Sequence, residues 1–155
     1  MYVQTKYYTF GIVMEKCDSV YCGCLHFSAG ALSRAMTKMA DEEFAITGLS
    51  SSYAFLLMTV NSRPGITPTG LSEQMLLTPS TITRLIEKME AKQMVERKTV
   101  GRTTEVYPTE KSKALDKDIK KAWRNLFDRY AKIIGEEESQ RLTSEIYGAV
   151  KKLDA

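Results

Sequence analysis

Apolar residues recur at every third or fourth position along most of this 155-residue chain, which is the spacing of amphipathic α-helices. A first helix is predicted over residues 19–43, and its recurring apolar positions are Leu25, Ala29, Leu32, Met36 and Met39. The segment 53–62 is apolar on nearly every side, as a central core helix would be. Residues 1–18 show no comparable pattern, and Met14 offers a second start for the chain, so we predict no element there.

Two short helices follow, and each begins with a Thr-Pro pair. Thr67 and Thr78 are suited to the N-cap, and Pro68 and Pro79 to the first helical position, where a missing N–H is harmless. The second of these helices is predicted to extend to about Gln93. Two short helices joined so tightly predict a helix-turn-helix.

After Met94 the hydrophobic period changes from about 3.6 residues to two. Residues 95–107 alternate between apolar and polar side chains around Gly101, which favours a β-hairpin with a polar tip. Pro108 and Thr109 end the hairpin, and Thr109 is suited to cap the next helix.

Two long helices are predicted at the C-terminal end, over residues 110–134 and 136–153, with Gly135 as the break. The first would be about 38 Å long, which exceeds the need of so small a core. Its apolar stripe is therefore predicted to pack on a second chain. The aromatic residues Trp123, Phe127 and Tyr130 are interpreted as packing residues rather than as a ligand site.

Composition narrows the function. With 43% hydrophobic and 26% charged residues, the chain is predicted to be a soluble domain with a real core. One histidine and no paired-carboxylate, phosphate-loop or nucleophile motif argue against an enzyme, so no catalytic residue, metal or cofactor is predicted. No signal peptide or membrane span is recognised in the sequence, which favours the cytoplasm and no membrane partner.

The positive charge is concentrated in one segment. Residues 84–113 hold eight basic and five acidic side chains, a surplus equal to the +3 of the whole chain. Such a local surplus is typical of a phosphate-binding face, and double-stranded DNA is the partner that we predict.

The helix that begins at Pro79 has two unlike faces. Ile82, Leu85, Ile86 and Met89 form one buried stripe. The other face carries small hydroxyl groups at the N-terminus, where free N–H groups and the helix dipole favour phosphate, and cations one and two turns later. We predict base contacts from Ser80, Thr81 and Arg84, and phosphate contacts from Thr78, Lys88 and Arg97.

The hairpin tip is predicted to contact the DNA backbone or the minor groove, where arginine is favoured. Its candidate residues are Arg97, Lys98, Arg102, Thr103 and Thr104.

The order of these elements resembles the MarR family of winged-helix transcriptional regulators. The resemblance covers about residues 22–153 and rests on the segment "LSEQMLLTPSTITRLIEKMEAKQMVERK" followed by a wing and "VYPTEKSKAL". Gln93-Met94 stands where the family pattern has Gly-Leu, and the shorter wing lacks the usual aspartate. The family's minor-groove arginine is therefore assigned to Arg102 alone.

The resemblance implies a mainly α-helical fold with a β-hairpin wing, in one domain over residues 19–153. The DNA-binding lobe would span about residues 50–108, and the dimerisation helices about 19–43 and 110–153. It also implies a homodimer on a pseudo-palindromic operator, acting as a repressor and released by a small aromatic or oxidant effector. A dimeric interaction module without DNA binding is the alternative outside this class.

Three cysteines and the only histidine lie close together, and three interpretations stay open. Cys17, Cys22 and Cys24 are small apolar packing residues, or Cys22 or Cys24 is a redox-sensing thiol near a helix start, as in peroxide-sensing members of the family. The third is a soft-metal site with His26, which i, i+2 spacing on a helix disfavours.

Overall fold

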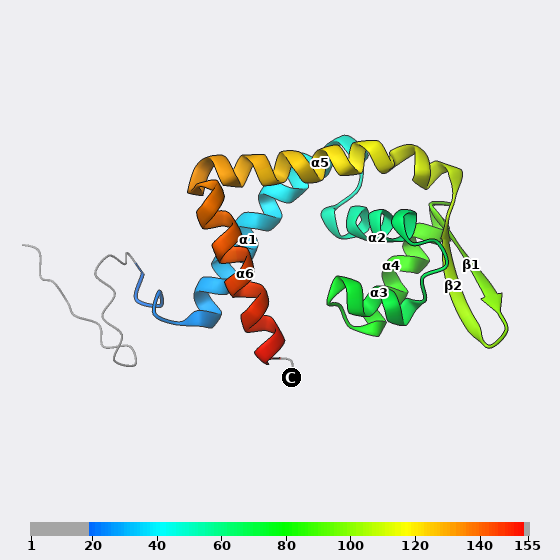
Figure 1. Cartoon of the computed structure of the whole chain (residues 1–155), viewed down its shortest axis with the longest axis horizontal. Coiled ribbons are helices and arrows are strands. Elements are labelled where there is room, and N and C mark those ends of the chain that lie inside the picture. Colours follow the sequence, from blue (N-terminus) through cyan, green and yellow to red (C-terminus); the bar gives the residue numbers. More distant parts are fainter. Residues whose placement is uncertain (1–18, 154–155) are drawn as a thin grey trace, which may run out of the picture. The chain divides into compact units, whose positions relative to one another are not determined.

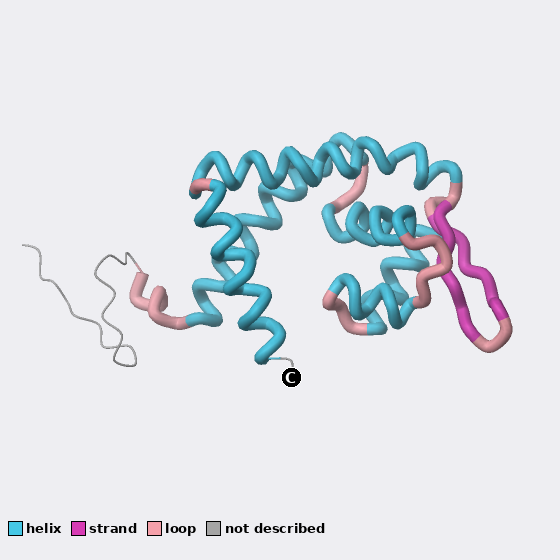
Figure 2. The backbone as a smooth tube through the Cα atoms, in the orientation of Figure 1, coloured by secondary structure: helices cyan, strands magenta, loops and turns pink. Residues whose placement is uncertain are grey.

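A computed structural model describes residues 19–153, which form helices and one two-stranded sheet (Figures 1 and 2). The chain divides into two compact units, Met1–Met39 and Ala40–Ala155. In chain order the elements are α1 (Leu25–Phe44), a 3-10 turn (Ala45–Thr47), α2 (Ser51–Ser62), α3 (Pro68–Met75), α4 (Pro79–Ala91), β1 (Val95–Val100), β2 (Thr103–Pro108), α5 (Glu110–Ile134) and α6 (Glu136–Leu153). The predicted mainly α-helical fold with a hairpin wing is confirmed.

The first helix begins at Leu25, later than the predicted residue 19. The residues before it form turns, in which the Cys22 N–H donates to the Ser19 carbonyl at 3.2 Å and the Cys24 N–H to that of Tyr21 at 2.9 Å. Gly23 lies in this stretch, and glycine disfavours a helix by about 1 kcal/mol relative to alanine. The apolar spacing thus predicted the helix but not its first turn.

The core of the second unit surrounds α2. Leu56, Leu57 and Val60 of this helix are fully buried, as its all-round apolar pattern predicts. α2 packs against α3, α4, α5 and β2. Between α2 and α3, the Gly65 N–H donates to the Val106 carbonyl and the Val106 N–H to the Ile66 carbonyl, which ties the loop to the wing.

The wing is an antiparallel hairpin whose register pairs Val95 with Pro108 and Val100 with Thr103. Gly101 lies at the turn with φ of 62°, a conformation that favours glycine. The base of the hairpin is buried through Val95 and Val106, whereas its tip is exposed. The predicted hairpin and its bend are confirmed.

α5 and α6 have the bounds predicted from the sequence. Within the second unit, Arg129 of α5 forms ion pairs with Glu42 and Glu43 at the end of α1. Large apolar side chains remain exposed near the α5–α6 connection and along α6, namely Ile133, Ile134, Ile146, Tyr147 and Leu153.

Within the described part of the chain, no single helix is both long and apolar enough to cross a membrane. Leu25–Thr47 and Ser51–Ser62 pass that test of length and composition only together, as a bent pair. Most of the apolar surface of α2 is already used in the core.

Candidate nucleic-acid interface

The N-terminus of α4 is built by Thr78 and Pro79. The Thr78 hydroxyl oxygen accepts from the Thr81 N–H at 3.4 Å, and it lies 3.1 Å from the Ser80 hydroxyl and 2.9 Å from that of Thr81. Pro79 occupies the first turn, as predicted. Thr78, Ser80 and Thr81 are all exposed, so three hydroxyl groups are brought together at the positive end of the helix dipole.

The two faces of α4 separate as their spacing predicts. Ile82, Ile86 and Met89 are buried in the core, with exposed fractions of at most 1%. Arg84 and Lys88 are exposed on the other face. Among the described residues neither has a carboxylate partner at ion-pair distance; the Lys88 ammonium lies 6.0 Å from the centre of the Tyr53 ring. These two cations are therefore available to an external anion.

Arg97 is held differently. Its Nε donates to Glu90 Oε2 at 2.9 Å, and its Nη2 forms an ion pair with the same oxygen. The bond lowers the pKa of the Glu90 carboxyl below its usual value and raises the pKa of Arg97. Arg97, a predicted phosphate ligand, is thus tied to the last turn of α4 rather than extended toward solvent.

At the wing, Lys98 forms an ion pair with Glu96 at 2.8 Å, and its ammonium lies 4.9 Å from the centre of the Tyr107 ring. The Tyr107 hydroxyl donates to Glu105 at 2.6 Å, which raises the pKa of the phenol. Arg102, at the tip, is exposed and has no ion-pair partner within residues 19–153. Thr103 is exposed beside it. Of the three basic side chains of the wing, Arg97, Lys98 and Arg102, only Arg102 therefore has no carboxylate partner among residues 19–153.

The end of α4 is a Schellman turn, in which the Met94 N–H donates to the Met89 carbonyl and the Gln93 N–H to the Glu90 carbonyl, both at 2.8 Å. Gln93 has a φ of 58°, although the residue at this position of the motif is most often glycine. The buried side chains of Met89 and Met94 accompany the turn. The predicted helix end at about Gln93 is close, since α4 ends at Ala91.

The cysteines lie in the first unit, apart from the α4 surface in sequence. Cys22 is disulfide-bonded, whereas Cys24 is a free and exposed cysteine directly before α1. Cys17 lies outside the described residues. In residues 19–153 no group of three His, Cys, Asp or Glu side chains is arranged to hold a metal ion.

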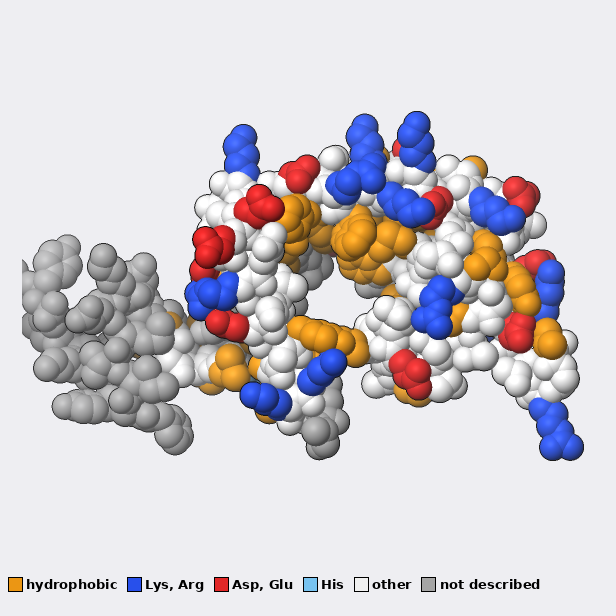
Figure 3. Space-filling model, in the orientation of Figure 1, with side chains coloured by type: hydrophobic (Ala, Val, Ile, Leu, Met, Phe, Trp, Pro, Cys, Tyr) orange, Lys and Arg blue, Asp and Glu red, His pale blue; other side chains and the backbone are white. Residues whose placement is uncertain are grey.

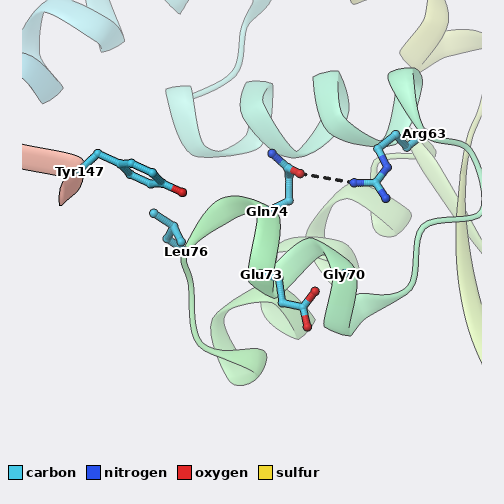
Figure 4. Close-up of a pocket in the computed structure, with 6 residues that line it drawn as sticks. All are labelled: Arg63, Gly70, Glu73, Gln74, Leu76 and Tyr147. Atoms are coloured by element: carbon cyan, nitrogen blue, oxygen red, sulfur yellow. Dashed lines mark hydrogen bonds between the residues drawn. The ribbon is translucent and has the colours of Figure 1, made fainter. Parts of the chain in front are cut away.

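A hollow of about 360 Å³ lies between α3 and α6 (Figure 4). Tyr147 of α6 points toward Leu76 at the end of α3, and Arg63 Nη1 donates to Gln74 Oε1 at 3.4 Å. Glu73 and Gly70 complete its lining. The sequence interpretation did not identify this site, because Arg63 and Tyr147 are separated by most of the second unit and share no motif.

A second hollow of about 340 Å³ lies along α5, and all its lining residues belong to that helix: Trp123, Arg124, Phe127, Asp128 and Tyr130. The Trp123 side chain is 52% exposed, so it is not a core residue of the single chain. The rings of Phe127 and Tyr130 meet edge to face at 5.4 Å, and burial raises the pKa of Tyr130. Figure 3 shows apolar side chains gathered beneath α5.

Comparison with known proteins gives one family. Residues 49–99 match the model of the MarR family. No curated protein matches the chain. A MarR protein from Peptoclostridium difficile has a similar structure, with 22% sequence identity, a TM-score of 0.72 and coverage of 92% of each chain.

Two further structures were solved with bound partners. Staphylococcus aureus MepR in a DNA complex is 14% identical, with a TM-score of 0.72 over 83% of this chain and 97% of that one. Rhodococcus jostii CouR bound to p-coumaroyl-CoA is 20% identical, with a TM-score of 0.67 over 79% of this chain and 88% of that one. Residues 49–99 therefore match the MarR family model, and the chain has the same winged-helix fold as these solved structures.

Proposed function

We propose that this protein is a homodimeric, sequence-specific DNA-binding transcriptional repressor that a small molecule releases from its operator. The observation that carries the proposal is the outer face of α4. There, three clustered hydroxyl groups and two cations without carboxylate partners among the described residues lie opposite an apolar stripe that is at most 1% exposed. The separation of faces is common to amphipathic helices. What favours a helix that enters a major groove is the combination on the exposed face of small hydroxyl groups at the N-terminus with cations that have no carboxylate partner among the described residues.

The roles follow from position on the helix. Ser80, Thr81 and Arg84 lie in the first two turns of the helix and would contact base edges, the arginine through its two-donor fork to guanine. Thr78 and Lys88 would contact phosphate. Arg97 would contact phosphate only by exchanging or sharing its bond to Glu90.

The wing would reach the neighbouring part of the duplex. Arg102 is exposed at the tip and would enter the minor groove, with Thr103 and Lys98 near the backbone. MepR, whose fold this chain shares, was solved in a DNA complex, which supports the same general use of the fold here.

A second copy of the chain would cover the exposed apolar side chains of α5 and α6. Two-fold symmetry would then place two α4 helices about one DNA turn apart, matching a pseudo-palindromic operator. The same dimer would close the hollow that Tyr147 and Arg63 line.

That hollow is the proposed effector site. The hollow has an aromatic ring and an aliphatic side chain, Tyr147 and Leu76, at one end and the Arg63 guanidinium at the other (Figure 4). An aromatic acid would fit this arrangement, with its ring against Tyr147 and its carboxylate paired with Arg63. CouR, with a similar fold, was solved with p-coumaroyl-CoA, an aromatic acyl ligand. Occupation of the site between α3 and α6 would shift the dimer away from the DNA-bound state.

The direct test compares Arg84→Ala and Lys88→Ala on operator and random duplex across a salt series. Arg84→Ala should weaken operator binding by about 1–3 kcal/mol and relax base preference, since it removes base contacts. Lys88→Ala should weaken all sequences alike and lower the salt slope by about one unit. Fluorescence anisotropy measures both.

Two controls sharpen the experiment. Arg84→Lys keeps the charge but loses the fork, so it should retain affinity for random duplex and still lose operator preference. Lys132→Ala, on an exposed position of α5, should change neither affinity. Equal loss of operator and random binding in Arg84→Ala would refute its base-reading role, and no binding of the wild type at low salt would refute the function.

A thiol-based redox regulator of the same fold is the second candidate. It is favoured by two cysteines in different states near the start of α1, since Cys22 is disulfide-bonded and Cys24 is free and exposed. If the cysteines regulate binding, peroxide or dithiothreitol should change operator affinity by about tenfold or more in the wild type. The Cys24→Ser and Cys22→Ser variants should lose that response, whereas an unchanged affinity in both reagents would assign the cysteines to structure alone.

A further inference from the structure

The first two turns of α5 hold the end of the recognition helix. The Thr109 hydroxyl donates to the Gln93 carbonyl at 2.8 Å and also lies 3.1 Å from that of Met94. Lys111 Nζ donates to the Lys92 carbonyl at 3.0 Å. The Met94 carbonyl also accepts from the Thr109 N–H at 3.2 Å. Three consecutive carbonyls directly after α4 therefore accept hydrogen bonds from the start of α5.

The same two turns hold α2. Ser112 Oγ donates to Asn61 Oδ1 at 2.8 Å, and Asn61 Nδ2 lies 3.2 Å from Asp116 Oδ1 and 3.3 Å from the Ser112 carbonyl. Ser112 is fully buried, and its N–H donates to the Thr109 hydroxyl. Asp116 also pairs with Lys120, so every polar group of the cluster has a partner.

We name this set of residues the α5 joint: Asn61, Thr109, Lys111, Ser112 and Asp116. The hydrogen bonds of the joint depend on the direction of donor and acceptor, whereas apolar contacts between the same helices would allow the helices to slide and rotate. A partly buried network of this kind, centred on the buried Ser112, favours one geometry between the elements that it connects. The joint therefore connects α2 and the end of α4 to one short stretch of the helix that continues toward the proposed dimer interface.

We propose that the α5 joint sets the direction of the recognition helix relative to α5, with Asn61 and Ser112 as positioning residues that orient α2, against which α4 packs. The inference rests on the proposed function, because its consequence is the spacing of two α4 helices in a dimer. Neither side chain needs to touch DNA. Operator binding requires both α4 helices at one spacing, whereas binding to random duplex does not require it to the same degree.

The variants separate direction from stability. Asn61→Leu removes the hydrogen bonds at similar volume but leaves the Ser112 hydroxyl buried without a partner, so the Tm should fall. The double variant Asn61→Leu/Ser112→Ala removes both polar partners, so the Tm should recover in large part. Ser62→Ala is the matched control, because the Ser62 hydroxyl is exposed and bonds only to Thr59 of its own helix.

Operator and random-duplex affinities are then measured for the full-length dimer. We expect the double variant to bind operator about tenfold or more weakly than the wild type, with random-duplex affinity within about twofold and Ser62→Ala unchanged. Operator affinity of the double variant within about twofold of the wild type would overturn the proposal, and so would an equal loss on both duplexes.

A second readout does not depend on DNA. Residual dipolar couplings of backbone amides in α4 and in the middle of α5 report the relative orientation of the two helices. In the double variant these couplings should no longer fit the wild-type orientation, while each helix alone still fits. Unchanged couplings would show that the joint does not set the direction of α4. This readout is independent of DNA binding, so it tests the joint even if the wild type binds no operator and the proposed function is wrong.

Discussion

At the scale of single residues, the end of α4 depends on partners that are distant in sequence. Arg97 is held by Glu90, and the carbonyls of Lys92 and Gln93 by Lys111 and Thr109. The basic residues of segment 84–113 thus divide into two groups. The first group is exposed and has no carboxylate partner among the described residues: Arg84, Lys88, Lys92 and Arg102. The second group is bonded to neighbouring protein groups: Arg97, Lys98, Lys111 and Lys113.

Gln93 provides a prediction about stability. Its φ of 58° is a left-handed conformation that disfavours every residue with a Cβ. Gln93→Gly should raise stability by about 0.5–1 kcal/mol, because relief of strain exceeds the added freedom of the unfolded chain. Thermal denaturation at fixed protein concentration should show a Tm increase of about 1–4 °C.

Gln93→Ala is the control for that change. It removes the same side-chain atoms beyond Cβ and keeps the strained φ, so its Tm should not rise. An equal rise in Tm in both variants would assign the effect to loss of the long side chain. A fall in Tm for Gln93→Gly would show that the backbone strain relieved is smaller than the entropy that glycine adds to the unfolded chain.

At the scale of elements, local chemistry predicted most of the fold. Thr67-Pro68 and Thr78-Pro79 mark the starts of α3 and α4 because capping and proline geometry act within one turn. The start of α1 lies later than the apolar spacing predicts, because Gly23 disfavours a helical turn there. The 3-10 turn after α1 and the joint at Asn61 depend on three-dimensional contacts and leave no periodic signal.

For the candidate interface, the sequence predicts which residues of α4 are exposed but not which side chains bond to each other. The α4 face follows from a 3.6-residue period, so the exposure of Arg84 and Lys88 could be predicted from sequence alone. The capture of Arg97 by Glu90 could not, since the hairpin must first fold back beside α4. The hollow between Arg63 and Tyr147 required α6 to be placed near α3.

The wing provides the prediction at this scale. Arg102→Ala should weaken binding to sites with a narrow, A·T-rich minor groove beside the core site by about 1 kcal/mol or more, and G·C-flanked sites less. Hairpin stability should not change, because the Arg102 side chain has no ion-pair partner in the described chain. Anisotropy titrations of two duplexes that differ only in their flanks measure the effect.

Thr99→Ala, on the exposed part of the same hairpin, is the matched variant and should leave both titrations unchanged. Identical losses on the two flanks would assign Arg102 to phosphate contact. An unchanged affinity on both would remove the wing tip from the interface.

At the scale of the whole molecule, large apolar side chains are exposed both at the α5–α6 connection and at the far end of α6. Ile133 and Leu153 are 70% and 75% exposed. Burying one such side chain contributes about 1.5–3 kcal/mol to the free energy of association. In a two-fold symmetric dimer each contact occurs twice, once for each chain. We therefore propose that this exposed apolar surface is where the second copy of the chain packs.

Ile133→Glu tests that surface. A carboxylate placed in an apolar contact without a partner disfavours association, so the dimer dissociation constant should rise by about a hundredfold or more. Sedimentation velocity over a concentration series measures it, with Lys132→Glu as the neighbouring exposed control that should remain dimeric. Because one lobe alone contacts only one half-site, operator affinity should fall together with dimer content, whereas a fully dimeric Ile133→Glu would place the two-fold interface elsewhere.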